Sequence, residues 1–235
     1  MKKSKDNLGD RMKTYEEVSQ VSLIRRTPVV VRLDGKAFHT FTKGAEKPFD
    51  KNIGDAMAMT ALKLCKEMQG AVFAYTQSDE ISVLLQDWKT LTTDPWYANN
   101  VQKIVSVSAS VATASFNSLY KKPTGTFALF DSRAYNIPFL EVTNYFIWRQ
   151  ADATRNSISG LAQSQFSHKQ LHGKGRAQMM DMLMEKGINW NDVETRFKRG
   201  ICVVPFESSY KIDLAPPIFT ADRNYIDKCF NFEEV

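Results

Sequence analysis

The order of the apolar segments constrains the fold of this 235-residue chain more than any other feature of its sequence. Short runs rich in β-branched and aromatic residues are typical of strands, and longer runs with an apolar residue at every third or fourth position are typical of helices. We expect strands at 29–33, 71–75, 81–85 and 127–131, and helices at 50–69 and 95–120. This β-α-β-β-α-β order is that of the ferredoxin-like, split βαβ fold, and it predicts an α+β protein.

This topology predicts that two acidic turns meet at one edge of the sheet. Right-handed crossovers make the first and second strands parallel and place the third strand between them. Asp34 and Gly35 end the first strand, and Asp79 lies in the turn 76–80 between the second and third strands. Both turns therefore lie at the same sheet edge, although they are far apart in the sequence. A single acidic turn is usually a solvated loop, whereas two that converge indicate a functional site.

Two converging carboxylates indicate a site for a hard cation. Together with a backbone carbonyl they suit Mg²⁺, which also binds phosphate oxygens. Two such ions roughly 4 Å apart would clamp the attacking and leaving oxygens of an in-line displacement, as in a palm-like site for nucleotidyl transfer. Glu80, next to Asp79, either joins this set or accepts hydrogen bonds behind it. His39 is expected near phosphate or in a structural role, and no cluster of His and Cys indicates zinc.

Composition limits the partners and the compartment. A net charge of +5 and a pI near 9.0 mildly favour a polyanionic partner. Three widely spaced cysteines without metal-ligand spacing are expected to be reduced thiols of a cytoplasmic protein. We find no signal-peptide pattern and no apolar stretch long enough to span a bilayer.

Five motifs carry more specific information than the periodicity does. The chain contains Arg-Leu-Asp-Gly-Lys-Ala-Phe-His-Thr-Phe at 32–41, Lys-Pro at 47–48, Gln-Ser-Asp-Glu at 77–80, Phe-Asp-Ser-Arg at 130–133 and Trp-Arg-Gln-Ala-Asp at 148–152. In this order, from about residue 8 to residue 205, the chain resembles the histidine-tRNA guanylyltransferases and their relatives, which extend RNA in the 3′-to-5′ direction. Either the first or the third motif alone would be weak evidence for this family, but the two together are highly specific for it.

The resemblance implies a polymerase-palm core that binds two Mg²⁺ ions and uses ATP and GTP as substrates. It assigns the ions to Asp34, the Gly35 carbonyl and Asp79. We expect Glu80 beside them as a further catalytic carboxylate. Around the incoming nucleotide it places Lys36, Ala37, Phe38, His39, Lys47, Asp50 and Ser78.

A second phosphate site is expected on the helix 95–120. Lys103, Ser106 and Ser110 are spaced i, i+3, i+7, so one helix face could hold the triphosphate of an activating nucleotide. The same small serines could instead allow the helix to pack closely against a neighbour. Arg133 matches a family arginine near the phosphates, or it forms a surface ion pair that contributes little.

One departure from the family bears on the substrate. After the motif at 148–152 the eukaryotic guanylyltransferases have a His-Ile-Asn-Asn run, whereas this chain has Ala-Thr-Arg-Asn-Ser-Ile-Ser at 153–159, with Thr154 in place of the His. The loss of that His resembles the like-protein branch found in bacteria, archaea and phages. It favours template-directed repair of tRNA 5′ ends, with G addition to histidine tRNA as the alternative. Smaller departures are Lys36-Ala37 in place of Arg-Gly and Ser132 in place of Gly.

The chain is expected to form a catalytic core over 1–140 and a helical extension with closing strands over 141–235, packed on the same unit. The extension is basic, which indicates contacts with tRNA phosphates or, alternatively, a solvated helical face. Within it we expect a loop at 167–176, a strand at 201–206 and an acidic surface segment at 222–235. The resemblance further implies a homotetramer. The predicted RNA-binding residues are Arg149, Arg155, Asn156, Lys169, Lys174, Arg176, Lys198 and Arg199.

Two other functions share these features. A nucleotide cyclase or another palm-domain enzyme would have the same paired acidic turns but would turn over nucleotide without RNA. A non-catalytic RNA-binding module would use the exposed face of a ferredoxin-like sheet, bind RNA without Mg²⁺ and tolerate the loss of Asp34. No Gly-Phe-aromatic RNA-binding motif lies on an expected strand, which counts against the module.

Overall fold

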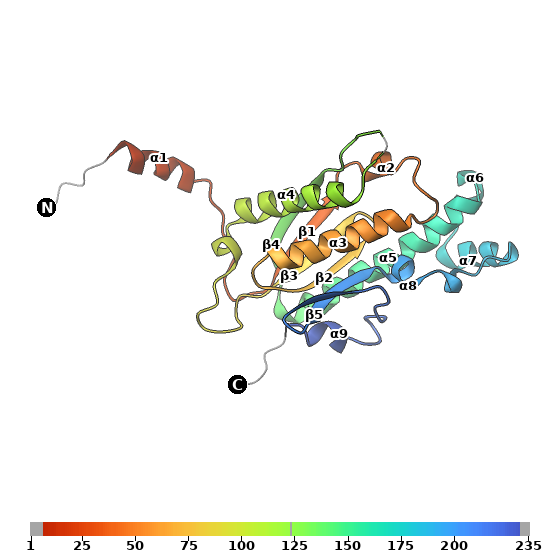
Figure 1. Cartoon of the computed structure of the whole chain (residues 1–235). Coiled ribbons are helices and arrows are strands. Elements are labelled where there is room, and N and C mark those ends of the chain that lie inside the picture. Colours follow the sequence, from red (N-terminus) through yellow and green to blue (C-terminus); the bar gives the residue numbers. More distant parts are fainter. Residues whose placement is uncertain (1–6, 123, 231–235) are drawn as a thin grey trace.

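An antiparallel sheet organises the computed structural model, which describes residues 7–122 and 124–230. Within these residues the sheet has six strands in the order β4-β1-β3-β2-β5-β6 (Figure 1). β1 and β2 both pair antiparallel with β3, so they run parallel with β3 between them, which confirms the predicted α+β fold and its ferredoxin-like order. The strands are β1 (Val29–Gly35), β2 (Ala71–Gln77), β3 (Glu80–Leu85), β4 (Phe130–Asn136), β5 (Ile201–Phe206) and β6 (Ser209–Asp213).

The fourth strand begins three residues later than the apolar run predicted, at Phe130. The expected start, Phe127, is 72% exposed. Ala128 has both of its backbone groups bound by the side chain of Asn117, at 2.8 Å each, so it needs no partner strand. The predicted start at Phe127 was wrong because a side chain of the preceding helix takes the place of strand pairing.

Two capped helices cover one face of the sheet (Figure 1). α3 (Lys51–Glu67) begins at Asp50, whose carboxylate accepts the backbone N–H of Ile53 at 3.1 Å, as expected of an N-cap. α4 (Val101–Leu119) is capped by Asn100. It starts later than the predicted residue 95 because the preceding turn η1 (Trp96–Asn99) contains left-handed backbone that an α-helix does not tolerate.

The other face packs against α5 (Val142–Gln165) and the C-terminal segment with α9 (Asn224–Asp227). The end of α5 also holds a small third core with α6 (His168–Leu171) and α7 (Arg176–Glu185). The predicted loop at 167–176 therefore contains a short helix, begun by Ser167 and Gln170 in a capping box. The strand at 201–206 is confirmed as β5, and the acidic segment 222–235 is described only as far as residue 230.

The N-terminal helix α1 (Leu8–Glu17) projects from the body (Figure 1). None of its residues, all of which are described, is buried. The helix ends at Glu17, and the chain then bonds the start of α4, where the backbone N–H of Val101 donates to the carbonyl of Val21 at 2.8 Å. Cys65, Cys202 and Cys229 are free thiols, as predicted. Among the helices described, none has both the length and the apolar character of a membrane span.

Candidate active site

A cavity of about 430 Å³ lies beyond the ends of β2 and β3, between the start of α3 and the middle of α5. Five predicted nucleotide-binding residues line it: Phe38, His39, Lys47, Asp50 and Ser78. Asp79, a predicted metal ligand, and Asn156, a predicted RNA contact, line it as well. The tertiary structure therefore brings three sequence motifs and the middle of α5 to a common cavity.

The two acidic turns meet, as the topology predicted. The backbone N–H of Gly35 donates to the carbonyl of Asp79 at 3.1 Å. Ser78 and Asp79 form a two-residue hairpin, in which Ser78 has a φ of +52° and donates its hydroxyl to the Asp79 carboxylate at 3.1 Å. A Cβ on Gly35 would lie 2.3 Å from the ring of Phe38 and 3.0 Å from Cβ of Asp79, so only glycine fits between the turns.

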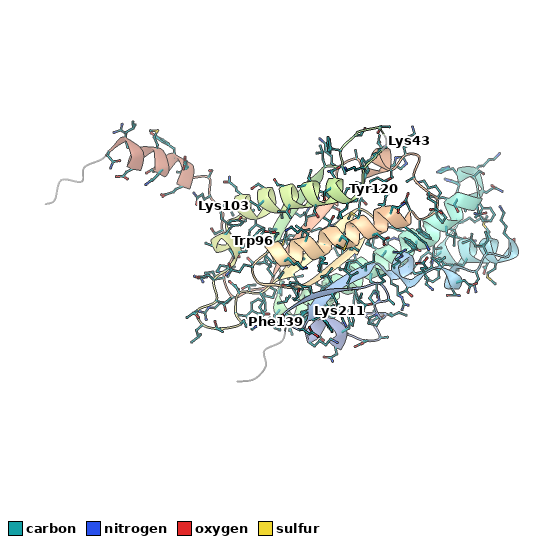
Figure 2. All side chains as sticks on the ribbon, viewed as in Figure 1. Lys43, Trp96, Lys103, Tyr120, Phe139 and Lys211 are labelled. Carbon is teal, nitrogen blue, oxygen red and sulfur yellow. The ribbon has the colours of Figure 1, made fainter. Side chains whose placement is uncertain are left out.

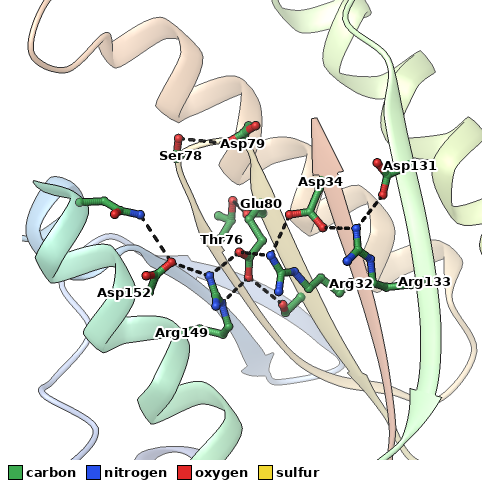
Figure 3. Close-up of polar contacts among 12 residues, drawn as sticks. Arg32, Asp34, Thr76, Ser78, Asp79, Glu80, Asp131, Arg133, Arg149 and Asp152 are labelled. Carbon is green, nitrogen blue, oxygen red and sulfur yellow. Dashed lines mark hydrogen bonds and ion pairs between the residues drawn. The ribbon is translucent and has the colours of Figure 1, made fainter. Parts of the chain in front are cut away.

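Asp34 lies beside two arginines (Figure 3). Arg32 Nη2 donates to its Oδ1 at 2.9 Å, and Arg133 Nη2 lies 3.2 Å from its Oδ2. All three side chains lie on the face of the sheet that α5 covers, because Arg133 is opposite Arg32 in the register of β4 and β1. Oδ2 is buried, and it accepts no hydrogen bond from the described residues. A metal ion at this oxygen would have to share it with the charge of Arg133.

Glu80 does not occupy the catalytic position that the sequence suggested. Its side chain is buried, with 4% of the residue exposed, and it accepts Nε and Nη2 of Arg149 at 2.7 Å each. Arg32 Nη2 lies 3.0 Å from the same carboxylate. The predicted RNA contact at Arg149 is corrected for the same reason, since this arginine is 3% exposed and also donates to Asp152 at 2.8 Å. Each of these buried charges is neutralised by the other, so neither side chain is available to a ligand.

Burial and charge shift the carboxyl groups of the hairpin. The pKa of Asp79 is raised, first by burial and further by the negative charge of Asp34, against the hydrogen bond from Ser78. The pKa of Glu80 is raised by burial, and Arg149 and Arg32 oppose that rise. When a carboxyl group with a raised pKa lies beside a second carboxylate, a bound cation stabilises its ionised form.

The donor set fits Mg²⁺ better than a transition metal. No group of three or more His, Cys, Asp or Glu in residues 7–122 and 124–230 is arranged to hold a metal ion. The two carboxylates Asp34 and Asp79 and the Gly35 carbonyl are all oxygen donors, and Asp34 has an oxygen without a hydrogen bond. Mg²⁺ commonly takes one or two protein carboxylates and completes its shell with water and substrate phosphates.

Other predicted residues lie outside the cavity. Lys36 and Ala37 are exposed next to it, and Ala37 has a φ of +51°, a backbone region for which the family's glycine is better suited. Lys103, Ser106 and Ser110 are exposed on α4, which covers the opposite face of the sheet from Asp34. The two serine hydroxyls donate to α4 carbonyls. Figure 2 shows Lys103 at one end of α4, whereas Tyr120 and the loop that contains Lys43 lie at the other end.

The predicted RNA-binding residues separate into two groups. Lys169, Lys174 and Arg176 are exposed on and between α6 and α7. The others are tied into the fold: Arg155 and Asn156 contact Asp152, Lys198 donates to the Asn191 carbonyl at 2.5 Å, and Arg199 lies near the Thr195 hydroxyl at 3.5 Å.

No sequence motif predicted the far wall of the cavity. It consists of Arg196 and Phe197 from the short helix α8 (Thr195–Arg199), together with Phe49. The rings of Phe49 and Phe197 are stacked, with centroids 4.9 Å apart and planes at 7°. Arg196 is held by Asp55 at 2.6 Å and Glu194 at 3.0 Å. Phe49 adjoins a recognised motif, whereas α8 is brought here only by the tertiary fold.

Comparison with known proteins decides the family. The family model described as tRNAHis guanylyltransferase matches residues 9–138, more than half of the chain. This chain belongs to the tRNAHis guanylyltransferase family. It is 31% identical to the tRNA(His) guanylyltransferase of Schizosaccharomyces pombe over 208 residues, which cover 80% of this chain and 77% of the relative.

Solved members of the guanylyltransferase family have the same fold. A bacterial tRNA(His) guanylyltransferase-like protein in complex with ATP is 49% identical, with a TM-score of 0.92 over 96% of this chain and all of the other. Another, in complex with GTP, is 44% identical, with a TM-score of 0.85 over 95% of this chain and 99% of the other. The chain is therefore an enzyme of the nucleotidyltransferase class, from a family that acts in tRNA processing.

Proposed function

We propose that this enzyme adds nucleotides in the 3′-to-5′ direction to tRNA 5′ ends and repairs ends that lack nucleotides, with the opposite strand as template. The observation that carries the proposal is that the two acidic turns meet and that Asp79 of the second turn lines a cavity of about 430 Å³. In the reaction, the 3′ oxygen of an incoming nucleoside triphosphate bonds to the 5′ phosphorus of the RNA. Pyrophosphate leaves from a 5′-triphosphate end, and AMP leaves from an end activated by ATP.

Asp34, the Gly35 carbonyl and Asp79 would hold Mg²⁺ in this proposal. Two bound ions supply polarisation of the attacking hydroxyl and neutralisation of the leaving phosphate. The chain's own residues hold the reactants: His39, Lys47 and Ser78 line the cavity with polar groups, and the stacked rings of Phe49 and Phe197 give it an apolar wall for a base. The ATP and GTP complexes of the two bacterial relatives support nucleoside triphosphates as substrates.

The position of Thr154 favours repair over dedicated G addition. This threonine stands where the eukaryotic family members have His, and its hydroxyl donates to the Lys198 carbonyl at 3.1 Å. The side chain therefore joins α5 to α8 and offers nothing to a substrate. Lys169, Lys174 and Arg176 remain exposed for phosphate contacts with tRNA. The predicted homotetramer stays a prediction.

The test uses purified protein, Mg²⁺, the four nucleoside triphosphates and two 5′-labelled tRNAs. One is a histidine tRNA that lacks its extra 5′ G, and the other is a different tRNA that lacks its first paired nucleotide. We expect extension of the second, with the added base changing when the opposite base is changed. Extension of the histidine tRNA alone would instead identify a dedicated guanylyltransferase. Nucleotide turnover without either RNA would point to a cyclase-like enzyme.

A further inference from the structure

Arg32 is shared between two carboxylates. Its Nη2 lies 2.9 Å from Asp34 Oδ1 and 3.0 Å from Glu80 Oε2. Its Nε has no hydrogen-bond partner among the described residues. Nη2 of Arg32 contacts both carboxylates. A change that weakens its contact with Glu80 therefore lets the guanidinium shift toward Asp34.

Glu80 is the fixed member of this trio. Arg149 donates two parallel hydrogen bonds of 2.7 Å to it. This bidentate contact fixes the orientation of the carboxylate. Arg149 is itself fixed, because it donates to Asp152 (Figure 3). Its guanidinium carbon also lies over the Trp148 ring, 4.2 Å from the ring centroid. Burial keeps water from loosening these contacts. The fixed Glu80 carboxylate therefore determines the position of the Arg32 guanidinium.

We infer that Glu80 is a positioning residue that controls how strongly Asp34 binds a divalent cation. Arg133 already lies 3.2 Å from Oδ2 of Asp34, so a second arginine held fully on Oδ1 would neutralise the carboxylate. By attracting part of the Arg32 charge, Glu80 leaves negative charge on Asp34 for Mg²⁺. Without that pull, Arg32 would neutralise Asp34 and compete with the cation for the same oxygens. The inference rests on the proposed metal site, and it gives the buried Glu80–Arg149 pair a purpose beyond stability.

Two other roles for Glu80 make different predictions. If Glu80 bound the metal, or acted only through its own negative field, its loss would weaken cation binding whether or not Arg32 were present. If Glu80 served only the fold, its loss would lower the unfolding temperature without altering cation affinity. Only a positioning role makes the effect depend on Arg32.

The experiment measures Mn²⁺ binding to the full chain by the electron paramagnetic resonance signal of free Mn²⁺, without nucleotide or RNA. We expect Glu80→Gln to weaken binding about tenfold, the scale of one charge-assisted hydrogen bond. In an Arg32→Gln background the same change should alter binding less than about twofold, and Arg32→Gln alone should bind Mn²⁺ more tightly than wild type. Glu80→Asp keeps the charge but shortens the reach, and it should also weaken binding.

Each result decides between the roles. An equal loss in both backgrounds, or normal binding by Glu80→Asp, would overturn the inference in favour of a direct effect of the charge. Unchanged affinity in Glu80→Gln would overturn it in favour of a role in the fold. If Glu80→Gln does not fold by circular dichroism, Arg32→Gln alone must still bind Mn²⁺ more tightly than wild type, or the inference is wrong. Normal binding by Asp34→Asn and Asp79→Asn would instead refute the proposed metal site itself.

Discussion

The two faces of the sheet are stabilised by different chemistry. Toward α3 and α4, β1 presents Val31 and Leu33 to an apolar core. Toward α5, the same strand begins with buried Val30 but then presents Arg32 and Asp34. Because successive residues of a strand point to opposite faces, one seven-residue strand supplies both a dry core and the start of an active site.

The difference shows where this fold can place charge. On the α3–α4 face each residue gains from leaving water, so the face can be apolar over its whole length. On the α5 face charges are buried only where opposite charges neutralise them. Asp79 lies outside this network, in the turn beyond the paired groups, and no ion pair of its carboxylate is found among the described residues. The paired groups of the α5 face are Asp34, Glu80, Asp131 and Asp152 with Arg32, Arg133, Arg149 and Arg155.

The largest effect is expected where the charged face meets the cavity. Asp34→Asn and Asp79→Asn should each reduce 5′ nucleotide addition by at least about 10³-fold, because each removes a charge from the proposed metal site. The measurement is single-turnover extension of a labelled tRNA. Circular dichroism should show a folded protein in both cases. Activity within tenfold of wild type in both variants would remove these residues from the chemistry.

Phe116→Ala tests the apolar face. Phe116 is fully buried and packs edge-on against Phe38, with ring centroids 5.5 Å apart. We expect the free energy of unfolding to fall by ~3–5 kcal/mol, measured by denaturant titration. Phe127→Ala is the matched control, because Phe127 is exposed and its truncation should change stability by less than about 0.5 kcal/mol. Similar losses at both positions would contradict the assignment of the core.

Arg149→Met tests the buried pair of the α5 face. The substitution leaves the Glu80 charge buried with only Arg32 beside it, so we expect a loss of ~3–5 kcal/mol in unfolding free energy. Arg155→Ala removes an exposed arginine of the same helix and should cost at most about 1 kcal/mol. If the double variant Arg149→Met/Glu80→Gln is no more stable than Arg149→Met, the loss does not come from an uncompensated charge.

Ala37→Gly tests the turn that leads from β1 into α2 (Phe38–Phe41). Ala37 has left-handed backbone, in which a Cβ is strained, so glycine should stabilise the protein by about 1 kcal/mol. Thermal unfolding reports the change. The flexibility that glycine adds to the unfolded chain opposes this gain. A clear loss of stability would show that the turn has no strain to relieve.

The pH dependence of stability tests the unpaired carboxyl group. Because the folded state raises the pKa of Asp79 above its ordinary value of 3.8, the folded protein binds a proton more tightly than the unfolded chain does. The stability that this group contributes is present below that value and is lost as the pH rises through the folded pKa.

Asp79→Asn removes that dependence. In EDTA, its stability relative to wild type should therefore increase from about pH 4 to about pH 6. Added Mg²⁺ should reduce the difference, because a bound cation favours the ionised carboxylate. A difference that does not vary with pH would show that burial does not shift this group.

Local signals were sufficient for much of the fold. The β-branched run of β1, the apolar spacing of α3 and the strand–turn–strand pattern of β2 and β3 predicted elements that the structure confirms. These signals are carried by residues adjacent in sequence. The start of β4 was predicted wrongly because Asn117, ten positions before Phe127, satisfies the backbone of Ala128.

The sequence by itself determined the element order, the meeting of Asp34 and Asp79, and the family resemblance. It could do so because periodicity, turn chemistry and the handedness of crossovers depend on residue order alone. Only the tertiary structure decided the role of Glu80, whose partner Arg149 lies 69 positions away, and the cavity wall from α8. Whether a carboxylate acts on a substrate or neutralises a buried arginine depends on what the folded chain places beside it.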